Sequence, residues 1–223
     1  MCFSAEASFG ASALLGTIGY FSVKKVQAKE QRLFAGIPLI FSLQQFTEGC
    51  LWIAFENYYP TLEIISTYTF LVIAQVIWPT FVPYAILLLE KEEKRKRWLN
   101  LLLLLGGIAS VYLAFGMAVY EVKSEVDCYH IHYDLHFPCA NPFTIVLFYV
   151  LPTIASLFVS SVNKMNLMGV LVVITLLVAY VFYTKYALSV WCFFAALVST
   201  VILIILSDMN NTSKAINNKE QRF

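Results

Sequence analysis

The amino-acid sequence predicts an all-α membrane protein, a polytopic bundle of seven transmembrane helices. Hydrophobic residues make up 60% of the 223 residues, charged residues only 13%, and the mean hydropathy is +0.73. Soluble domains carry about a quarter charged residues, so this composition excludes the soluble classes. The net charge of +1 gives no indication of nucleic-acid binding. Membrane lipid is therefore the expected partner, and nucleic acid is not.

Seven apolar stretches predict the individual helices. Each stretch approaches or exceeds the roughly 20 residues that a helix needs to cross the hydrocarbon core. The stretches cover residues 7–23, 33–55, 64–89, 98–120, 143–161, 165–184 and 187–207. We expect one transmembrane domain over residues 1–207 and a polar cytoplasmic tail over residues 208–223.

The basic residues predict the orientation of the bundle. They gather after the first, third and fifth stretches and in the tail, and only Lys123 and Lys185 of the 15 lysines and arginines fall elsewhere. Basic residues are enriched on the cytoplasmic side of a membrane. We therefore expect the N-terminus outside and the C-terminus in the cytoplasm.

The second stretch carries polar residues along one side. At about 100° per residue, Gln44, Gln45, Glu48 and Trp52 fall within one sector of a helix. A carboxylate in the hydrocarbon region costs roughly 2.5–3.5 kcal/mol even on the lenient insertion scale, and such residues usually mark a site or a pathway. This side of the helix must face protein or water, which makes Glu48 the centre of the predicted site.

Polar groups from other stretches are expected at the same depth in the outer half of the bundle. Gln75 lies in the third stretch, and Trp191 lies near the outer end of the last one. At the start of the chain, Cys2, Ser4 and Glu6 stand where the first helix emerges. We expect these residues to close an outward-facing pocket around Glu48.

The longest connection, residues 121–142, is expected as an external loop. It holds all three histidines between two cysteines, Cys128 and Cys139. Cysteines outside the cytoplasm commonly pair, so a disulfide between these two is predicted. Imidazole and thiolate also bind zinc or copper, which makes the histidines weak metal-site candidates, although their spacing matches no familiar finger pattern. These histidines are His130, His132 and His136.

Four motifs carry a resemblance to a known family. They are MCFSAEASFG at the N-terminus, QQFTEGCLW in the second stretch, WPTFVP in the third and WCFFAALVS in the last. The chain resembles a bacterial domain-of-unknown-function family of seven-span membrane proteins that open Met-Cys-aromatic-Ser-Ala. The resemblance implies a bacterial inner membrane as the location, and it brings no activity. The matching positions are Cys2, Ser4, Gln44, Gln45, Glu48, Trp52, Trp78, Pro79, Trp191 and Cys192.

The sequence leaves several functions open. The first is a protein that binds or senses a small polar or cationic ligand in the pocket around Glu48, through aromatic faces and one carboxylate. The alternative is a metal-dependent membrane enzyme that uses Glu48 with Cys2 or the loop histidines. A third is proton-coupled transport through a buried acid. Catalysis, cofactors, ligand identity and oligomeric state are left undetermined.

Overall fold

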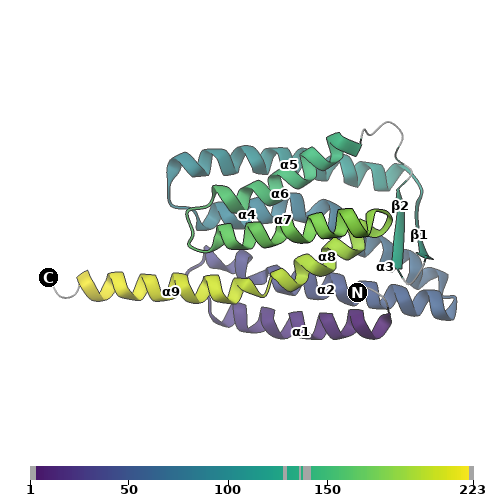
Figure 1. The fold of residues 1–223 in the computed structure, drawn as a ribbon, viewed down its shortest axis with the longest axis horizontal. Helices are drawn as coiled ribbons and strands as arrows, with labels where there is room; N and C mark the ends of the chain where they lie inside the picture. The colour runs from purple at the N-terminus through teal and green to yellow at the C-terminus, as the bar shows by residue number, and fades with distance from the viewer. Residues whose placement is uncertain (1–3, 128–129, 136, 138–141, 221–223) are drawn as a thin grey trace.

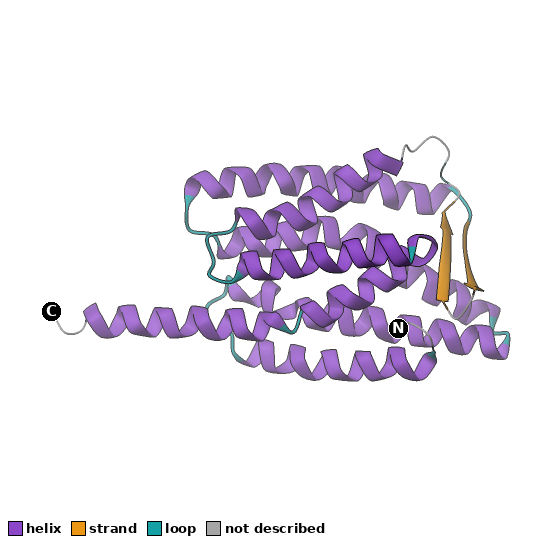
Figure 2. Cartoon of the chain, in the orientation of Figure 1, coloured by secondary structure: helices purple, strands orange, loops and turns teal. Residues whose placement is uncertain are grey.

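The computed structural model describes residues 4–127, 130–135, 137 and 142–220. Figure 1 shows a bundle of long helices that run along one common direction, and Figure 2 shows strands β1 and β2 together at one end. In chain order the elements are α1 (Ala5–Lys24), α2 (Gln31–Asn57), α3 (Pro60–Leu71), the π-helix η1 (Val72–Ile77), α4 (Trp78–Leu89), α5 (Glu93–Val119), β1 (Val122–Asp127), β2 (His130–Leu135), α6 (Pro142–Val159), α7 (Met165–Phe182), the 3₁₀ turn η2 (Thr184–Tyr186), α8 (Ala187–Val198) and α9 (Val201–Glu220).

The all-α class is confirmed, and helices cover all seven of the predicted stretches. Within the described part of the chain, four segments are long and apolar enough to cross a membrane, namely Pro60–Leu89, Glu93–Val119, Met165–Phe182 and Thr184–Thr212. A shorter apolar helix covers Leu147–Val159. The chain therefore has the character of an integral membrane protein. Seven crossings and the orientation of the ends remain predictions.

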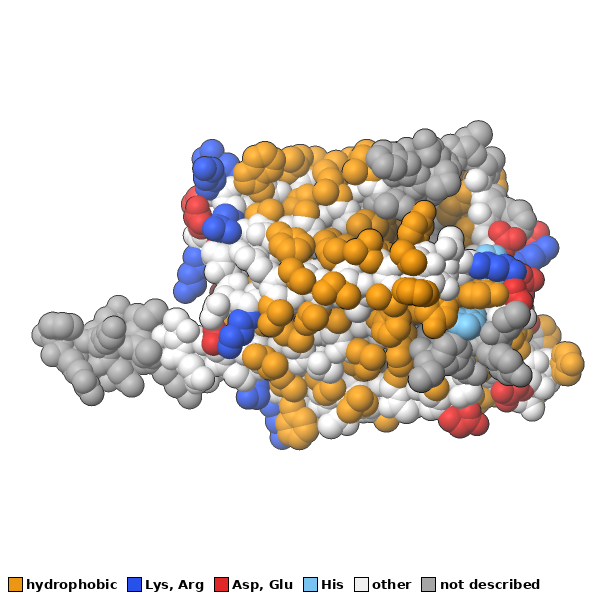
Figure 3. All heavy atoms as spheres, viewed as in Figure 1, with side chains coloured by type: hydrophobic (Ala, Val, Ile, Leu, Met, Phe, Trp, Pro, Cys, Tyr) orange, Lys and Arg blue, Asp and Glu red, His pale blue; other side chains and the backbone are white. Residues whose placement is uncertain are grey.

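The surface is divided along the bundle axis in the way that a membrane protein requires. Figure 3 shows a broad hydrophobic belt in the middle, with most of the visible lysines and arginines at the end from which α9 projects. Acidic side chains and histidine gather at the opposite end, next to the hairpin. An exposed apolar belt between two polar ends suits a protein whose middle is surrounded by lipid tails.

Helices α1 and α2 pack closely through small residues. The Ser12 and Ser42 hydroxyls each donate to the other residue's backbone carbonyl at 2.8 Å. Glycines on both helices lie against the partner helix, and a Cβ added at Gly19 would lie 2.5 Å from the Leu39 side chain. Small residues let helices approach in lipid, where the hydrophobic effect between helices is weak.

The third predicted stretch is one long segment, α3–η1–α4, with a π-helical turn in its middle. Pro79 and Pro83 lack the N–H groups that an α-helix would use here, which frees carbonyls of the preceding turns. Neighbouring helices bind carbonyls of the π-helical turn: Tyr149 of α6 donates to Ala74, and Ser110 of α5 donates to Val76 at 2.6 Å. The segment that leads into the two prolines is thus a π-helical turn that is held from two sides.

At the basic end, the connections between helices are tied together by Glu90. Its carboxylate accepts bonds from the Ser161 hydroxyl at 2.6 Å, from the Ser161 N–H at 2.7 Å and from the N–H groups of Lys91 and Glu92. Burial alone would raise the pKa of Glu90, but these donors outweigh that effect and hold its pKa below the usual value. One acidic residue therefore links the α4–α5 connection to the α6–α7 connection.

The 121–142 connection, expected as a loop, contains the antiparallel hairpin β1–β2. Ile131 and Tyr133 are the buried side chains of β2, and the Tyr133 ring stacks on Phe70 of α3 with centroids 4.7 Å apart. Because alternate side chains of a strand point to opposite faces, the buried face covers the end of the bundle. Cys128, Cys139 and His136 lie outside the described residues, so the predicted disulfide remains a prediction.

The last predicted stretch is divided into two helices. Helix α8 ends at Val198, a turn at Ser199 and Thr200 follows, and α9 continues to Glu220. Helix α9 therefore extends through most of the residues expected as a polar tail, and Figure 1 shows it projecting beyond the bundle.

Candidate functional site

Glu48 lies on α2 at the centre of a buried polar cluster. Its side chain is fully buried, and both carboxylate oxygens accept hydrogen bonds. The Ser189 hydroxyl of α8 donates to Oε1 at 2.5 Å, and the Gln45 amide donates to Oε2 at 3.3 Å. A buried carboxyl needs such donors because desolvation penalises its charge. The bond from Ser189 fixes the position of α8 relative to α2 at this depth.

Gln44, next to Gln45 on α2, is bound from the opposite side of the cluster. The Trp78 indole of α4 donates to Gln44 Oε1 at 2.9 Å. An indole N–H can only donate, so this bond fixes the orientation of the Gln44 amide. The Gln44 side chain also interacts with the Cys192 thiol of α8, but its Nε2 forms no full hydrogen bond with the described residues. In Gln45 the Nε2 group is used by Glu48, so Oε1 is the open end. Among the described residues, Gln44 thus has an unpaired donor and Gln45 an unpaired acceptor.

Several buried polar atoms of this region have no hydrogen-bond partner among the residues that the structure describes. Such a group costs roughly 1–3 kcal/mol when it stays unpaired, and most buried polar groups in proteins are paired with protein or ordered water. Two of the atoms belong to Gln44 and Gln45 of the cluster itself, which indicates a place that holds water or a ligand. In this region the atoms without a partner among the described residues are Gln44 Nε2, Gln45 Oε1, Trp52 Nε1, Gln75 Oε1 and Trp191 Nε1.

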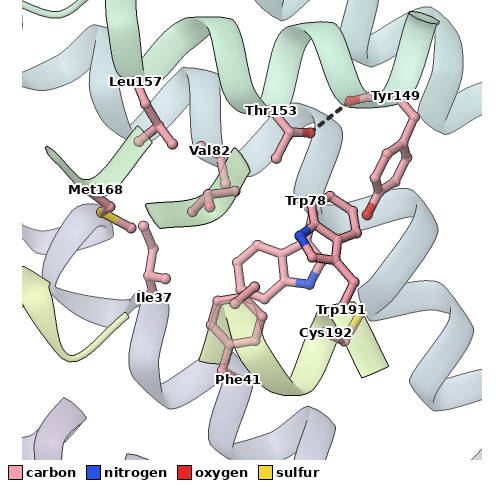
Figure 4. Close-up of a pocket in the computed structure, with 12 residues that line it drawn as sticks. Ile37, Phe41, Trp78, Val82, Tyr149, Thr153, Leu157, Met168, Trp191 and Cys192 are labelled. Atoms are coloured by element: carbon pink, nitrogen blue, oxygen red, sulfur yellow. Dashed lines mark hydrogen bonds between the residues drawn. The ribbon is translucent and has the colours of Figure 1, made fainter. Parts of the chain in front are cut away.

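A small aromatic cavity adjoins the cluster. Its volume is about 50 Å³, and side chains from α2, α4, α6, α7 and α8 line it. Figure 4 shows the indole rings of Trp78 and Trp191 between Phe41 of α2 and Tyr149 of α6. Cys192, which also lines the cavity, lies close to Gln44 and Glu48. The polar cluster and the aromatic cavity thus form one continuous region of the interior.

The aromatic walls of the cavity pack against one another. The Phe41 and Trp78 rings are stacked with centroids 4.1 Å apart, and the Tyr149 and Trp191 rings meet edge to face at 6.0 Å. Contacts of this kind hold large side chains in fixed positions. Two pairs of mutually packed aromatic rings therefore bound the cavity.

The structure brings some of the sequence-predicted residues together and sets others apart. Gln44, Gln45 and Glu48 form the cluster, and Trp191 borders the adjoining cavity. Trp52 and Gln75 are both buried, Trp52 one turn beyond Glu48 and Gln75 on η1.

The N-terminal candidates lie at the start of α1. Ser4 caps this helix, where its hydroxyl accepts a bond from the Ala7 N–H at 3.2 Å. Glu6 is exposed in the first turn, and Cys2 lies outside the described residues. The described N-terminal candidates are thus a helix cap and a surface acid.

The two described histidines lie on β2 and contact the α7–α8 connection. The His130 ring stacks on Tyr186 with centroids 4.6 Å apart, and His132 Nδ1 lies 2.9 Å from the Lys185 carbonyl oxygen. Among the residues that the structure describes, no group of three or more His, Cys, Asp or Glu side chains is placed to hold a metal ion. His130 and His132 thus attach the hairpin to the bundle.

Sequence reasoning missed two residues of this region as site residues. Ser189 is the donor to Glu48 from another helix, and Tyr149 forms a cavity wall while it binds the Ala74 carbonyl. A signal for Ser189 was present, because Ser189 and Cys192 are three residues apart and share one face of a helix. Nothing in the apolar sequence around Tyr149 marks it as a site residue. Its hydrogen bond to the Ala74 carbonyl depends on the π-helical turn η1, which lies far away in the sequence.

The fold and the site together define an integral membrane helical bundle with a buried acidic cluster beside an aromatic cavity. Over residues 1–217 the chain matches a family described as a family of unknown function, DUF6629. The chain belongs to this family, which confirms the expected membership in a domain-of-unknown-function family. Comparisons with curated proteins and with solved structures give no match.

Proposed function

We propose that this protein binds a small polar or cationic molecule in its interior, at the polar cluster around Glu48. The observation that carries the proposal is the set of open, buried hydrogen-bonding atoms on Gln44, Gln45 and Trp191, beside a carboxyl group and a cavity. Binding sites are concave and mostly apolar, with a few polar groups that orient the ligand. The region around Glu48 likewise combines a mostly apolar cavity with a few buried polar groups.

The hydrogen bonds around Glu48 support a site with a fixed shape. Ser189 and Gln45 hold the carboxylate, Trp78 holds Gln44, and the aromatic rings hold one another. Such a site loses little conformational entropy when a ligand enters, because its side chains are already ordered. This feature favours recognition over the alternatives of metal-dependent catalysis and proton-coupled transport.

The proposed setting is a bacterial inner membrane that the chain crosses seven times. The N-terminus and the hairpin would lie outside, and α9 would enter the cytoplasm. The distribution of basic residues supports this orientation. In it Glu48 lies in the outer half of the bundle, nine residues before the end of α2 at Asn57.

Thermal unfolding in lipid nanodiscs tests the proposal. Ammonium, methylammonium, formamide and acetamide serve as small cationic and polar probes. We expect at least one probe to raise the Tm saturably, because a ligand that binds only the folded state stabilises it. Glu48→Gln is expected to weaken that response at least about tenfold, since a hydrogen bond to a charged group contributes about 1.5–3 kcal/mol.

Glu56→Gln is the matched control, because Glu56 lies on the same helix and is exposed. It is expected to leave the probe response unchanged. Ser189→Ala provides a second test if Glu48→Gln folds poorly. The proposal fails if no probe raises the Tm of the wild-type protein, or if the probes act equally on the wild-type protein and both site variants.

A further inference from the structure

We propose that the ligand of this site is a neutral molecule whose polar group both donates and accepts hydrogen bonds, such as a carboxamide or an alcohol. The inference rests on the proposed function and narrows its ligand class. Three observations carry it: the buried polar atoms that lack a hydrogen-bond partner among the described residues, the two donors that already bind Glu48, and the apolar lining of the cavity.

The open atoms require both kinds of hydrogen bond from a ligand. Among the described residues, Gln44 Nε2, Trp52 Nε1 and Trp191 Nε1 are donors without a partner, whereas Gln45 Oε1 and Gln75 Oε1 are acceptors without one. An ammonium or amidinium ion has no acceptor and would leave every open donor unpaired. A carboxylate has no donor, and Glu48 would repel it. A neutral group that both donates and accepts hydrogen bonds can pair with the donors and with the acceptors.

The orientation of the two glutamines is fixed by their neighbours and is therefore part of the recognition. Trp78 donates to Gln44, and Gln45 donates to Glu48, so neither amide can turn over without losing its bond. The open donor and the open acceptor thus stand on consecutive residues of α2. A carboxamide carries both kinds of group, a carbonyl oxygen and an N–H group, so it can pair with either amide.

Glu48 does not by itself call for a cation. Both of its carboxylate oxygens already accept hydrogen bonds from Ser189 and Gln45. Donors of this kind stabilise a buried carboxylate in the way that a counter-ion would. The carboxyl group can therefore organise the site, through Gln45 and Ser189, while the ligand remains uncharged.

The aromatic cavity provides the place for the apolar part of the ligand. Its lining is almost entirely hydrophobic, and Trp191, which is 7% exposed, contributes the open indole N–H. A volume of about 50 Å³ admits a group of only a few non-hydrogen atoms. The expected ligand part is a small amide or hydroxyl group with a short apolar substituent.

Three probes of nearly equal shape test the inference on the full-length protein in nanodiscs. Acetamide donates and accepts, acetamidinium only donates and carries positive charge, and acetate only accepts and carries negative charge. The readouts are the Tm and the indole ¹⁵N–¹H resonances of the four tryptophans. Exposed Trp98 supplies an internal control signal, and Trp191→Phe assigns the resonance of Trp191.

We expect acetamide to raise the Tm and to shift the Trp191 indole resonance, with no shift at Trp98. Trp191→Phe keeps an aromatic ring but removes the donor, and it should weaken acetamide binding about tenfold, whereas Trp98→Phe should not. Stronger binding of acetamidinium or acetate would overturn the inference while leaving the proposed function standing. Failure of acetamide to bind would also overturn the inference. If no probe changed the Tm or the indole resonances, the proposed function would be rejected as well.

Discussion

At the scale of single residues, the position of Glu48 depends on donors that come from different parts of the chain. Gln45 is a neighbour on the same helix, but Ser189 is separated from Glu48 by 141 positions in the sequence. A carboxyl group without such donors would be costly in a membrane interior. The Ser189 hydroxyl therefore contributes both to the site and to the packing of α8 against α2.

Ser189→Ala tests this contribution to stability. Removing the hydroxyl should lower the free energy of unfolding by about 1–2 kcal/mol, between the values for charged hydrogen bonds and the smaller averages found in membrane bundles. Reversible unfolding in mixed detergent micelles measures the change. Ser199→Ala is the control, because in the described structure the Ser199 hydroxyl bonds only the Ala196 carbonyl, in the last turn of the preceding helix α8. Equal effects of the two substitutions would contradict the assignment.

At the scale of elements, the α3–η1–α4 segment shows how proline residues shape the interior. Pro83 cannot donate to the Pro79 carbonyl one turn earlier, so this carbonyl is not part of the helical ladder. It lies against Gly106 of α5, where an added Cβ would stand 1.8 Å from the carbonyl oxygen. The break in one helix thus requires a glycine in its neighbour.

Gly106→Ala tests this dependence. We expect a loss of about 2–3 kcal/mol in the free energy of unfolding, because backbone on both sides must move to admit the methyl group. Gly107→Ala is the control, since nothing lies within 4 Å of a Cβ added there. That variant should be neutral or more stable by up to about 1 kcal/mol, because alanine favours a helix over glycine. If Gly106→Ala left the free energy of unfolding unchanged, α4 and α5 would have to lie further apart than they do in this structure.

Glu90 supplies a prediction about pH, because its pKa in the folded protein is depressed below 4.5. As the pH falls, the unfolded chain takes up the proton before the folded protein does, so the stabilisation by Glu90 is present above that value and lost below it. Glu90→Gln should therefore cost about 1–3 kcal/mol at neutral pH and progressively less as the pH falls below 4.5.

Chemical unfolding of both proteins across this pH range measures the difference. Glu92→Gln is the control, since Glu92 forms an exposed pair with Arg95 and should contribute less than about 1 kcal/mol. A difference between wild-type protein and Glu90→Gln that does not depend on pH would contradict the assignment of the shift to Glu90.

At the scale of the whole molecule, the belt of apolar side chains and the unequal charge of the two ends predict one orientation in the membrane. Basic residues stand at the end from which α9 projects, and the hairpin covers the other end (Figure 3). Reporter fusions test it. A reporter that is active only outside the cytoplasm should be active when inserted in the hairpin, and green fluorescent protein should fluoresce when fused after Phe223. The opposite pattern would reject the orientation.

The fold was predictable in class and in helix positions, because long apolar stretches in lipid have helices as their simplest structure. The hairpin was not predicted, although Ile131 and Tyr133 alternate with polar residues in the pattern of a strand. The π-helical turn was not predicted either, because its carbonyls are bound by Tyr149 and Ser110 from helices far along the chain. Glu48 could be recognised from the sequence, because an acidic residue within an apolar stretch usually marks a site. Its contact with Ser189 could not, because it depends on how α8 packs against α2.

The most direct measurement is an experimental density map of the protein with acetamide, at a resolution that shows ordered small molecules. Our account predicts density for a non-protein molecule within hydrogen-bonding distance of Trp191 Nε1 and of at least one open amide atom, Gln44 Nε2 or Gln45 Oε1. Substitution of Glu48 by Gln should remove or weaken that density. A map in which Trp191 Nε1, Gln44 Nε2 and Gln45 Oε1 all pair with protein groups, with no other molecule beside them, would contradict the proposed binding site.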